Sequence, residues 1–303
     1  MPNEDRSRHP DLLPSIAIVV GGMMWGLFWI PIHAIGRLGL TGAWPGALIY
    51  AACVTLLLPL LIMRRRQIGR QFRQLVWCGL LTGAAFSLYA TSLFLTDVVR
   101  VILLFYLTPV WGTLLGMFVL GERLTVPRVV ALVSGLLGLL VVLGIGANFP
   151  LPQSLGDWLA LASGMIWAYG SLRLYQMDGV GVSDQVLSFI GGSLLVSSLT
   201  VVIGGELFSG LQHDGVLQAA VPLAFLAALF VIPMLFLTLW PATVLTPARV
   251  GLLLMSEVVV GVGSAALYSG AEFGRREIIG TLLIVAAGFI EVMWRPKTKP
   301  GSG

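Results

Sequence analysis

Ten apolar stretches, which divide into two sets of five, constrain the fold more than any other feature of this sequence. A membrane-spanning helix needs roughly 20 mostly apolar residues. Charges, prolines and glycines separate ten such stretches, at 14–36, 44–63, 74–95, 98–120, 126–146, 155–177, 184–206, 216–240, 248–270 and 276–294. Hydrophobic residues make up 57% of the chain and charged residues 11%, against about 45–50% and about 25% in soluble domains. The sequence therefore predicts an all-α membrane protein with ten transmembrane helices.

The two sets of five resemble each other at a nearly constant separation. The segment that ends at Trp25 matches the one that ends at Trp167, and Arg100-Val101 matches Arg249-Val250 further along the chain. Because five is odd, a second copy must cross the bilayer in the opposite direction, as in alternating-access transporters. We expect two inverted five-helix repeats at 14–147 and 148–294, between an N-terminal tail, 1–13, and a C-terminal tail, 295–303.

The basic residues set the expected orientation. Of the 18 Lys and Arg, 14 fall on the side of the two chain ends, most visibly Arg64-Arg65-Arg66. By the positive-inside rule both termini face the cytoplasm, so the arrangement is N-in/C-in. The net charge of +4 is then a property of the loops, and we expect a lipid bilayer and no nucleic acid as partner.

Three short motifs carry a resemblance to a known family. Trp25-Gly26 in the first stretch, Leu107-Thr108-Pro109 in the fourth, and Gly121 to Leu124 at its end resemble the ten-helix EamA-type carriers of the drug/metabolite transporter (DMT) superfamily. The resemblance covers about 14–294, and within the family the chain is similar to bacterial inner-membrane exporters of aromatic and other amino acids. It implies a central cavity lined mainly by the first, third and fourth helices of each half.

The second half departs from the family pattern at three positions. Ala168 follows Trp167 where glycine is common, Val258 follows Glu257 where proline is common, and Ala271 stands where glycine is common. The fold implied by the resemblance is unaffected. Family roles are therefore not carried over to the motif residues of the second half.

Tryptophans away from the helix ends are candidates for a cavity wall. Interfacial tryptophans gather at helix ends, whereas Trp25, Trp29, Trp111 and Trp167 lie near mid-span, where each indole N–H needs a protein partner. Trp25, Trp29 and His33 share one helix face, beside a pair of glycines that could equally bring another helix close. The predicted substrate-binding residues are Trp25, Trp29, His33, Phe86, Tyr89, Tyr106, Trp111, Trp167, Tyr169 and Glu257.

Glu257 is the most informative charged residue within a predicted span. A carboxylate at the helix centre costs about 2.5–3.5 kcal/mol on insertion scales, so it must be paired, face water or be protonated. It shares a face with Gly261, Ser264 and Tyr268. Three roles stay open for it: a proton-coupling group, a contact for a substrate ammonium, or a structural hydrogen-bonding group.

Gating residues are expected where the two halves move. Arg100 and Arg249 fall at the N-terminal ends of equivalent helices, which the inversion would place on opposite faces of the membrane. They are candidates for two opposite gates, although boundary arginines can also simply meet lipid headgroups. Pro109 and Pro233 would interrupt their helices, and such breaks often mark a substrate site or a hinge.

The leading functional hypothesis is a secondary exporter of small amphipathic metabolites, in particular aromatic or neutral amino acids, across the bacterial inner membrane. The alternative is a proton-coupled exporter of cationic compounds that uses Glu257. A phosphosugar carrier would need clustered Lys or Arg at mid-depth, and this sequence has no such cluster. No motif of an intramembrane enzyme or of a P-loop ATPase occurs either. Cys53 and Cys78 have no metal-binding spacing. We expect no enzyme activity, no cofactor and no metal, and take a monomer as the working assumption.

Overall fold

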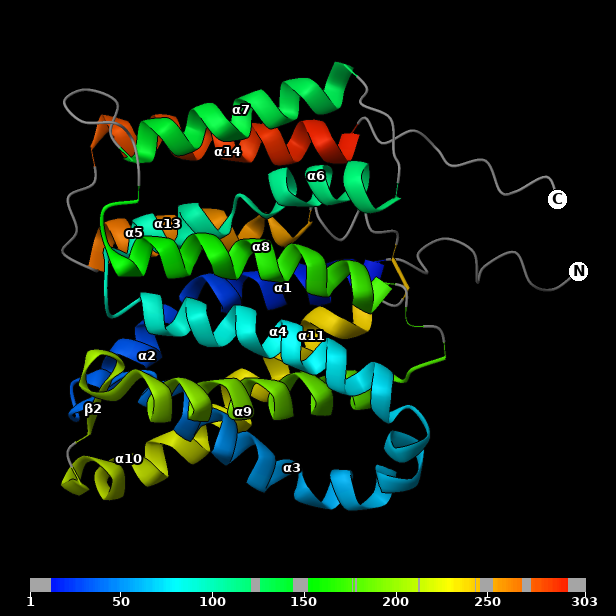
Figure 1. Cartoon of the computed structure of the whole chain (residues 1–303), viewed down its shortest axis with the longest axis vertical. Helices are drawn as coiled ribbons and strands as arrows, with labels where there is room; N and C mark the ends of the chain where they lie inside the picture. The colour runs from blue at the N-terminus through cyan, green and yellow to red at the C-terminus, as the bar shows by residue number, and fades with distance from the viewer. Residues whose placement is uncertain are drawn as a thin grey trace, which may run out of the picture.

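The computed structural model is almost entirely helical over the residues it describes, which are 12–120, 126–143, 152–175, 177, 179–211, 213–242, 244–245, 253–268 and 274–293. Its helices lie alongside one another, and a small sheet lies at one end (Figure 1). The elements in chain order are α1 (Leu12–Leu27), α2 (Trp29–Gly36), β1 (Leu40–Gly42), α3 (Trp44–Arg70), α4 (Phe72–Ser92), α5 (Val98–Phe105), α6 (Thr108–Leu120), α7 (Val126–Leu143), α8 (Leu155–Tyr175), α9 (Val182–Phe208), β2 (Ser209–Leu211), α10 (His213–Leu226), η1 (Ala227–Val231), α11 (Ile232–Ala242), α13 (Ser256–Tyr268) and α14 (Arg275–Met293).

Each predicted span overlaps a helix in the described part of the chain. Five helical segments there are long and apolar enough to cross a membrane by themselves, namely Leu12–Gly36, Trp44–Arg70, Phe72–Ser92, Val182–Gly204 and Gln218–Pro241. Cys53 and Cys78 are buried in these helices with free thiols. The count of ten spans and the inversion of the two halves stay predictions.

Prolines coincide with irregular turns in three of the predicted spans. A single residue, Phe28, separates α1 from α2 shortly before Pro31. Two residues, 106 and 107, separate α5 from α6, whose second residue is Pro109. The π-helical turn Ala227–Val231 directly precedes the segment that contains Pro233. Because proline has no N–H to donate to the preceding turn, helices break or widen just before it. The interruptions predicted at Pro109 and Pro233 are therefore present.

Glycines allow two pairs of helices from different halves of the chain to pack closely. A Cβ atom added at Gly83 of α4 would collide with the backbone of Gly192 in α9, and one at Gly79 would collide with Ser188. On α1, a Cβ at Gly26 would lie 2.5 Å from the Glu257 carbonyl oxygen of α13. Such small-residue seams let helix backbones approach within a membrane, so these glycines join the halves.

The small sheet is the one departure from the all-α prediction within the described residues. β1 pairs antiparallel with β2, with Leu40 opposite Leu211 and Gly42 opposite Ser209. Gly39 and Gly42 have positive φ angles of 82° and 66°, which glycine adopts without a steric penalty. The sheet lies at the left of Figure 1, opposite the turn between α3 and α4. It therefore ties the two halves at one end of the molecule.

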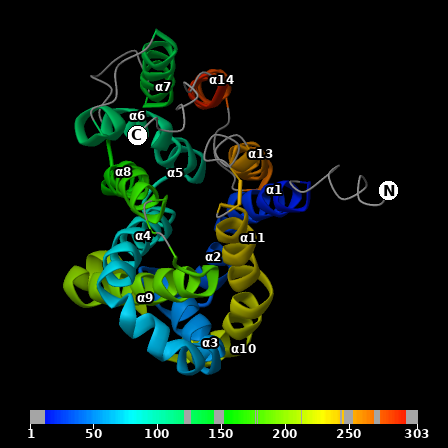
Figure 2. The same ribbon diagram turned by 90° about the vertical axis from the view of Figure 1, so that its right-hand side faces the viewer.

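Viewed along its helices, the molecule separates into a main group of helices and an outlying pair (Figure 2). The pair consists of α7 and α14, which pack against each other, and Ser134 Oγ of α7 donates to the Leu283 carbonyl oxygen of α14 at 2.9 Å. The remaining helices hold the aromatic core. The candidate site is therefore to be sought among α1, α4, α5, α8, α9 and α13.

Candidate functional site

An aromatic cluster centred on Phe86 of α4 lies in the core. The Phe86 ring is 4.2 Å from that of Trp25 in α1, 4.9 Å from Trp167 in α8 and 5.2 Å from Phe189 in α9, between centroids. Phe105 of α5 completes it at 5.8 Å. Trp25 and Trp167, the matched tryptophans of the two halves, thus meet the same ring from different helices. Both halves contribute to this one cluster.

Hydroxyl groups from the second half accept the indole hydrogens of α1 and α2. Trp25 Nε1 donates to Thr238 Oγ1 of α11 at 3.1 Å, and Trp29 Nε1 donates to Ser264 Oγ of α13 at 3.0 Å. The glycines beside these tryptophans pack against α13, while the Trp25 ring faces Phe86. The sequence left packing and cavity lining open for this face. The packing is observed, and one ring also joins the aromatic cluster.

Glu257 lies in the first turn of α13 at the edge of the aromatic cluster. It is buried, with 8% of its surface exposed, and its carboxyl interacts with the Tyr106 side chain and, electrostatically, with that of Tyr89. Tyr89 in turn packs on Phe105, 5.0 Å between ring centroids. In the described part of the chain the ion pairs involve other carboxylates, so Glu257 has no cationic partner there. A buried carboxyl group thus borders an aromatic surface.

The break in the fourth predicted span faces the start of α13. Tyr106 lies in the interruption between α5 and α6, and its hydroxyl donates to the Leu254 carbonyl oxygen at 2.7 Å. Thr108 Oγ1, at the start of α6, donates to the Phe105 carbonyl oxygen at 2.7 Å and satisfies another backbone group freed by the break. Interrupted helices that meet at mid-depth are typical of transporter substrate sites.

Several predicted site residues lie apart from this cluster. His33 stacks on Phe94, 5.2 Å between ring centroids, and its Nδ1 lies 2.9 Å from the Trp29 carbonyl oxygen. The Tyr169 hydroxyl accepts a hydrogen bond of 3.0 Å from the exposed Arg173. These two side chains are engaged with their own neighbours rather than with Phe86.

The other predicted residues lie in varied surroundings. Trp111 Nε1 is buried and finds no hydrogen-bond acceptor in the described structure. Tyr268 is 75% exposed, so the polar face expected on its helix ends at Ser264. Pro233 lies in α11, just after the π-helical turn η1. Arg249 lies outside the described residues. Within the described ranges, no three His, Cys, Asp or Glu side chains are grouped closely enough to hold a metal ion.

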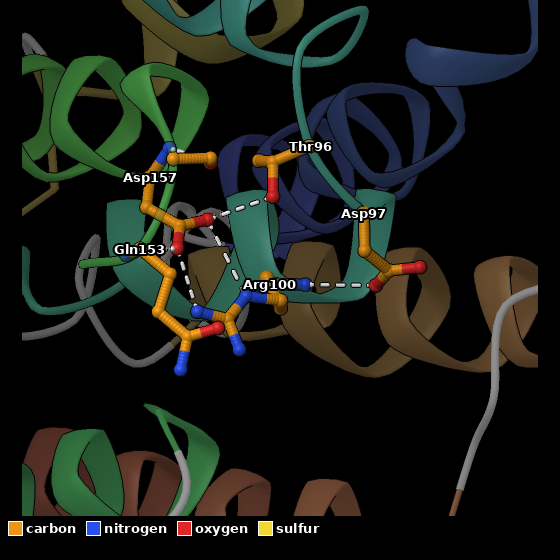
Figure 3. A network of polar contacts seen from close by, with 6 residues as sticks. Thr96, Asp97, Arg100, Gln153 and Asp157 are labelled. Carbon is orange, nitrogen blue, oxygen red and sulfur yellow. Dashed lines mark hydrogen bonds and ion pairs between the residues drawn. The ribbon is translucent and has the colours of Figure 1, made fainter. Parts of the chain in front are cut away.

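Arg100 binds a carboxylate that the sequence did not single out. Its guanidinium contacts Asp157 at 2.6 Å (Nη2–Oδ2) and 3.3 Å (Nε–Oδ1), as Figure 3 shows. Thr96 Oγ1 at 2.7 Å and the Gln153 backbone N–H at 3.0 Å also donate to Asp157. Asp97, the acid nearest in sequence, instead caps α5 by accepting from backbone N–H groups. The compensating partner of Arg100 is therefore Asp157, at the start of α8.

A second ion pair joins the halves at the opposite, arginine-rich end. Arg64 of α3 donates to Asp184 of α9 through Nε at 2.5 Å and Nη2 at 2.7 Å. Asp184 is fully buried, whereas the Arg64 side chain is 29% exposed. Neither Asp157 nor Asp184 was predicted, because acids in the first turn of a helix are common for reasons of the helix dipole alone. The signal available in the sequence was that each of these acids is predicted to lie on the same side of the membrane as an arginine.

Comparison with known proteins agrees with this architecture. Residues 12–144 match the EamA-like transporter family model. A solved crystal structure is similar over 94% of this chain and 96% of its own, with a TM-score of 0.58 and 20% identity, which supports the fold alone.

Two curated relatives share part of their length with the chain. A Salmonella typhimurium protein named "Probable amino-acid metabolite efflux pump" is 27% identical over 59% of this chain, and an Escherichia coli protein of the same name is 26% identical over 62%. The matched regions span 62% and 66% of these relatives, just under two thirds of their length. The predicted resemblance to the EamA-like transporter family is confirmed over residues 12–144, and both relatives are named as efflux pumps.

Proposed function

We propose that this chain is a secondary transporter that exports small amphipathic metabolites, specifically aromatic or neutral amino acids, across the bacterial inner membrane. The observation that carries the proposal is the buried Glu257 carboxyl beside Tyr89 and Tyr106, at the edge of the aromatic cluster around Phe86. A free amino acid carries an ammonium group, which a carboxylate binds, and an apolar side chain, which aromatic rings accommodate. The names of the relatives support this substrate class.

Alternating access would let this buried site reach each side of the membrane. Phe86 and Tyr89 are only 3% and 2% exposed, so a substrate can reach them only if helices of the two halves separate. In the proposed mechanism the five-helix halves 14–147 and 148–294 rock about the site, with Arg100 and Arg249 at the two gates. The interrupted helices before Pro109 and Pro233 would supply the bending points.

Transport by purified protein in liposomes tests the proposal. Wild-type protein should move labelled Phe, Trp or Met, and Phe86→Ala should reduce the rate at least about tenfold, because the ring joins both halves of the cluster. Phe225→Ala is the matched control, since Phe225 of α10 is 62% exposed. Absence of transport of every amino acid tried would rule out the proposed substrate class.

A second candidate, proton-coupled export of cationic compounds, rests on the absence of a cationic partner for Glu257 within the described residues. Glu257→Gln separates the two. If the carboxyl binds the substrate ammonium, the KM for amino acids rises about tenfold while the response to a pH gradient persists. If the carboxyl carries the coupled proton, the response to the gradient disappears with little change in KM.

A further inference from the structure

The turn between α3 and α4 carries a basic surface hollow that the proposed transport site does not use. Its volume is about 570 Å³, and it lies at the end of the molecule opposite the sheet. The lining residues are Met63, Arg64, Arg66, Gln67, Arg70 and Gln71. Three guanidinium groups therefore surround one hollow.

Two of these three arginines are available to a ligand. Arg64 already binds Asp184, which neutralises its charge. Arg66 and Arg70 are exposed, lie four residues apart on α3 and so share one helix face. Among the described residues, no carboxylate lies within ion-pair distance of either one. The hollow therefore has an uncompensated positive charge of about two.

The helix surface next to the hollow is apolar and exposed. Along α3, the exposed fraction is 46% for Leu58, 55% for Ile62 and 81% for Met63. Across the turn, Trp77 of α4 is 63% exposed, at a depth where tryptophan typically meets lipid headgroups. An apolar strip thus leads along the helix directly to the two arginines.

From this arrangement we propose that the hollow binds the phosphodiester headgroup of an anionic phospholipid, whose acyl chains lie along the exposed strip of α3. Arg66 and Arg70 would pair with the phosphate oxygens, for which the planar guanidinium is well suited. Basic clusters next to a transmembrane helix attract anionic lipids by about 1 kcal/mol per residue. A soluble phosphate compound would use the charges but leave the apolar strip uncovered.

Lipid binding to the delipidated, full-length protein in detergent tests this site. We expect phosphatidylglycerol to raise the unfolding temperature more than phosphatidylcholine with the same acyl chains does. In the double variant Arg66→Gln/Arg70→Gln the affinity for phosphatidylglycerol should fall roughly thirtyfold, from the loss of two charges near the surface. The double variant Arg275→Gln/Arg276→Gln is the control, because both residues are exposed at the start of α14.

Three outcomes would overturn the proposal. They are an unchanged affinity in Arg66→Gln/Arg70→Gln, an equal loss in the α14 control, and a shift reproduced by glycerol phosphate without acyl chains, which would indicate a soluble phosphate ligand. Native mass spectrometry of retained phosphatidylglycerol gives a second measurement that does not depend on unfolding. There the α3 variant should lose bound lipid while the α14 variant keeps it.

Discussion

The two ion pairs at opposite ends of the molecule satisfy their buried carboxylates in different ways. Asp157 receives hydrogen bonds from the Arg100 guanidinium, the Thr96 hydroxyl and the Gln153 backbone. Asp184 receives both of its side-chain hydrogen bonds from Arg64. The carboxylates are equally buried, 1% and 0% exposed. The number of independent donors, rather than burial, therefore distinguishes the two ends.

This difference bears on how each end could open. In both pairs the arginine belongs to the first half of the chain and the carboxylate to the second, so each pair links the halves. An Asp157 that keeps two donors after losing one can stay ionised and buried. Arg64 is the one side-chain partner of Asp184 among the described residues, and an Asp184 that loses it is left there as an uncompensated buried charge, which is costly. Within the described residues, Arg64 is thus the one cation that compensates the buried carboxylate at the arginine-rich end.

The largest expected effect is that of Arg64→Gln. It should lower the free energy of unfolding by about 3–5 kcal/mol, because it strands the buried Asp184 carboxylate. Chemical denaturation in detergent measures this loss. Adding Asp184→Asn should restore much of the stability, and Arg65→Gln, an exposed neighbour, should change it by less than about 0.5 kcal/mol. A small loss in Arg64→Gln would remove the proposed difference between the ends.

Arg100→Gln should have an intermediate effect. We expect a loss of about 2–3 kcal/mol in the same unfolding experiment, since Thr96 and the Gln153 backbone still donate to Asp157. The comparison depends on the order of the two arginine variants. A loss equal to that of Arg64→Gln would mean that the additional donors do not protect Asp157.

Thr96→Val should have the smallest effect of the three. It removes one donor to Asp157 and leaves the Arg100 ion pair, so we expect a loss of about 1 kcal/mol. Thr55→Val serves as control, because the Thr55 hydroxyl donates only to its own helix at an exposed position. Combined with Arg100→Gln, Thr96→Val should cost more than the two single losses added together, since the variants share one acceptor.

The central features could be predicted because local sequence determines them. Proline positions placed the breaks in α5/α6 and before α11, and mid-span tryptophans pointed to the aromatic cluster, as helix geometry and the missing proline N–H require. The close approach of α4 to α9 at Gly79 and Gly83 also follows from local sequence, since glycines four residues apart share one helix face. Such features need no knowledge of distant partners.

The cross-links between the halves could not be predicted, since they join distant residues. Arg100 and Asp157 are 57 positions apart, and Arg64 and Asp184 are 120 apart. The hydroxyl partners of Trp25 and Trp29 lie more than 200 positions away. The sequence indicates that each of these polar side chains needs a hydrogen-bonding partner. Which residue becomes that partner is determined by how the helices pack.

The pairing of β1 with β2 has a consequence for motion. Its hydrogen bonds join main-chain atoms, so ordinary side-chain substitutions at Leu40, Thr41 or Ser209–Leu211 leave them in place, whereas Gly42 has a positive φ that favours glycine. The connection is therefore robust to sequence drift, in contrast to ion pairs that one mutation removes. If the two halves rock about the site while this ladder holds, the sheet limits how far its own end can open, and the larger displacement occurs at the far, arginine-rich end.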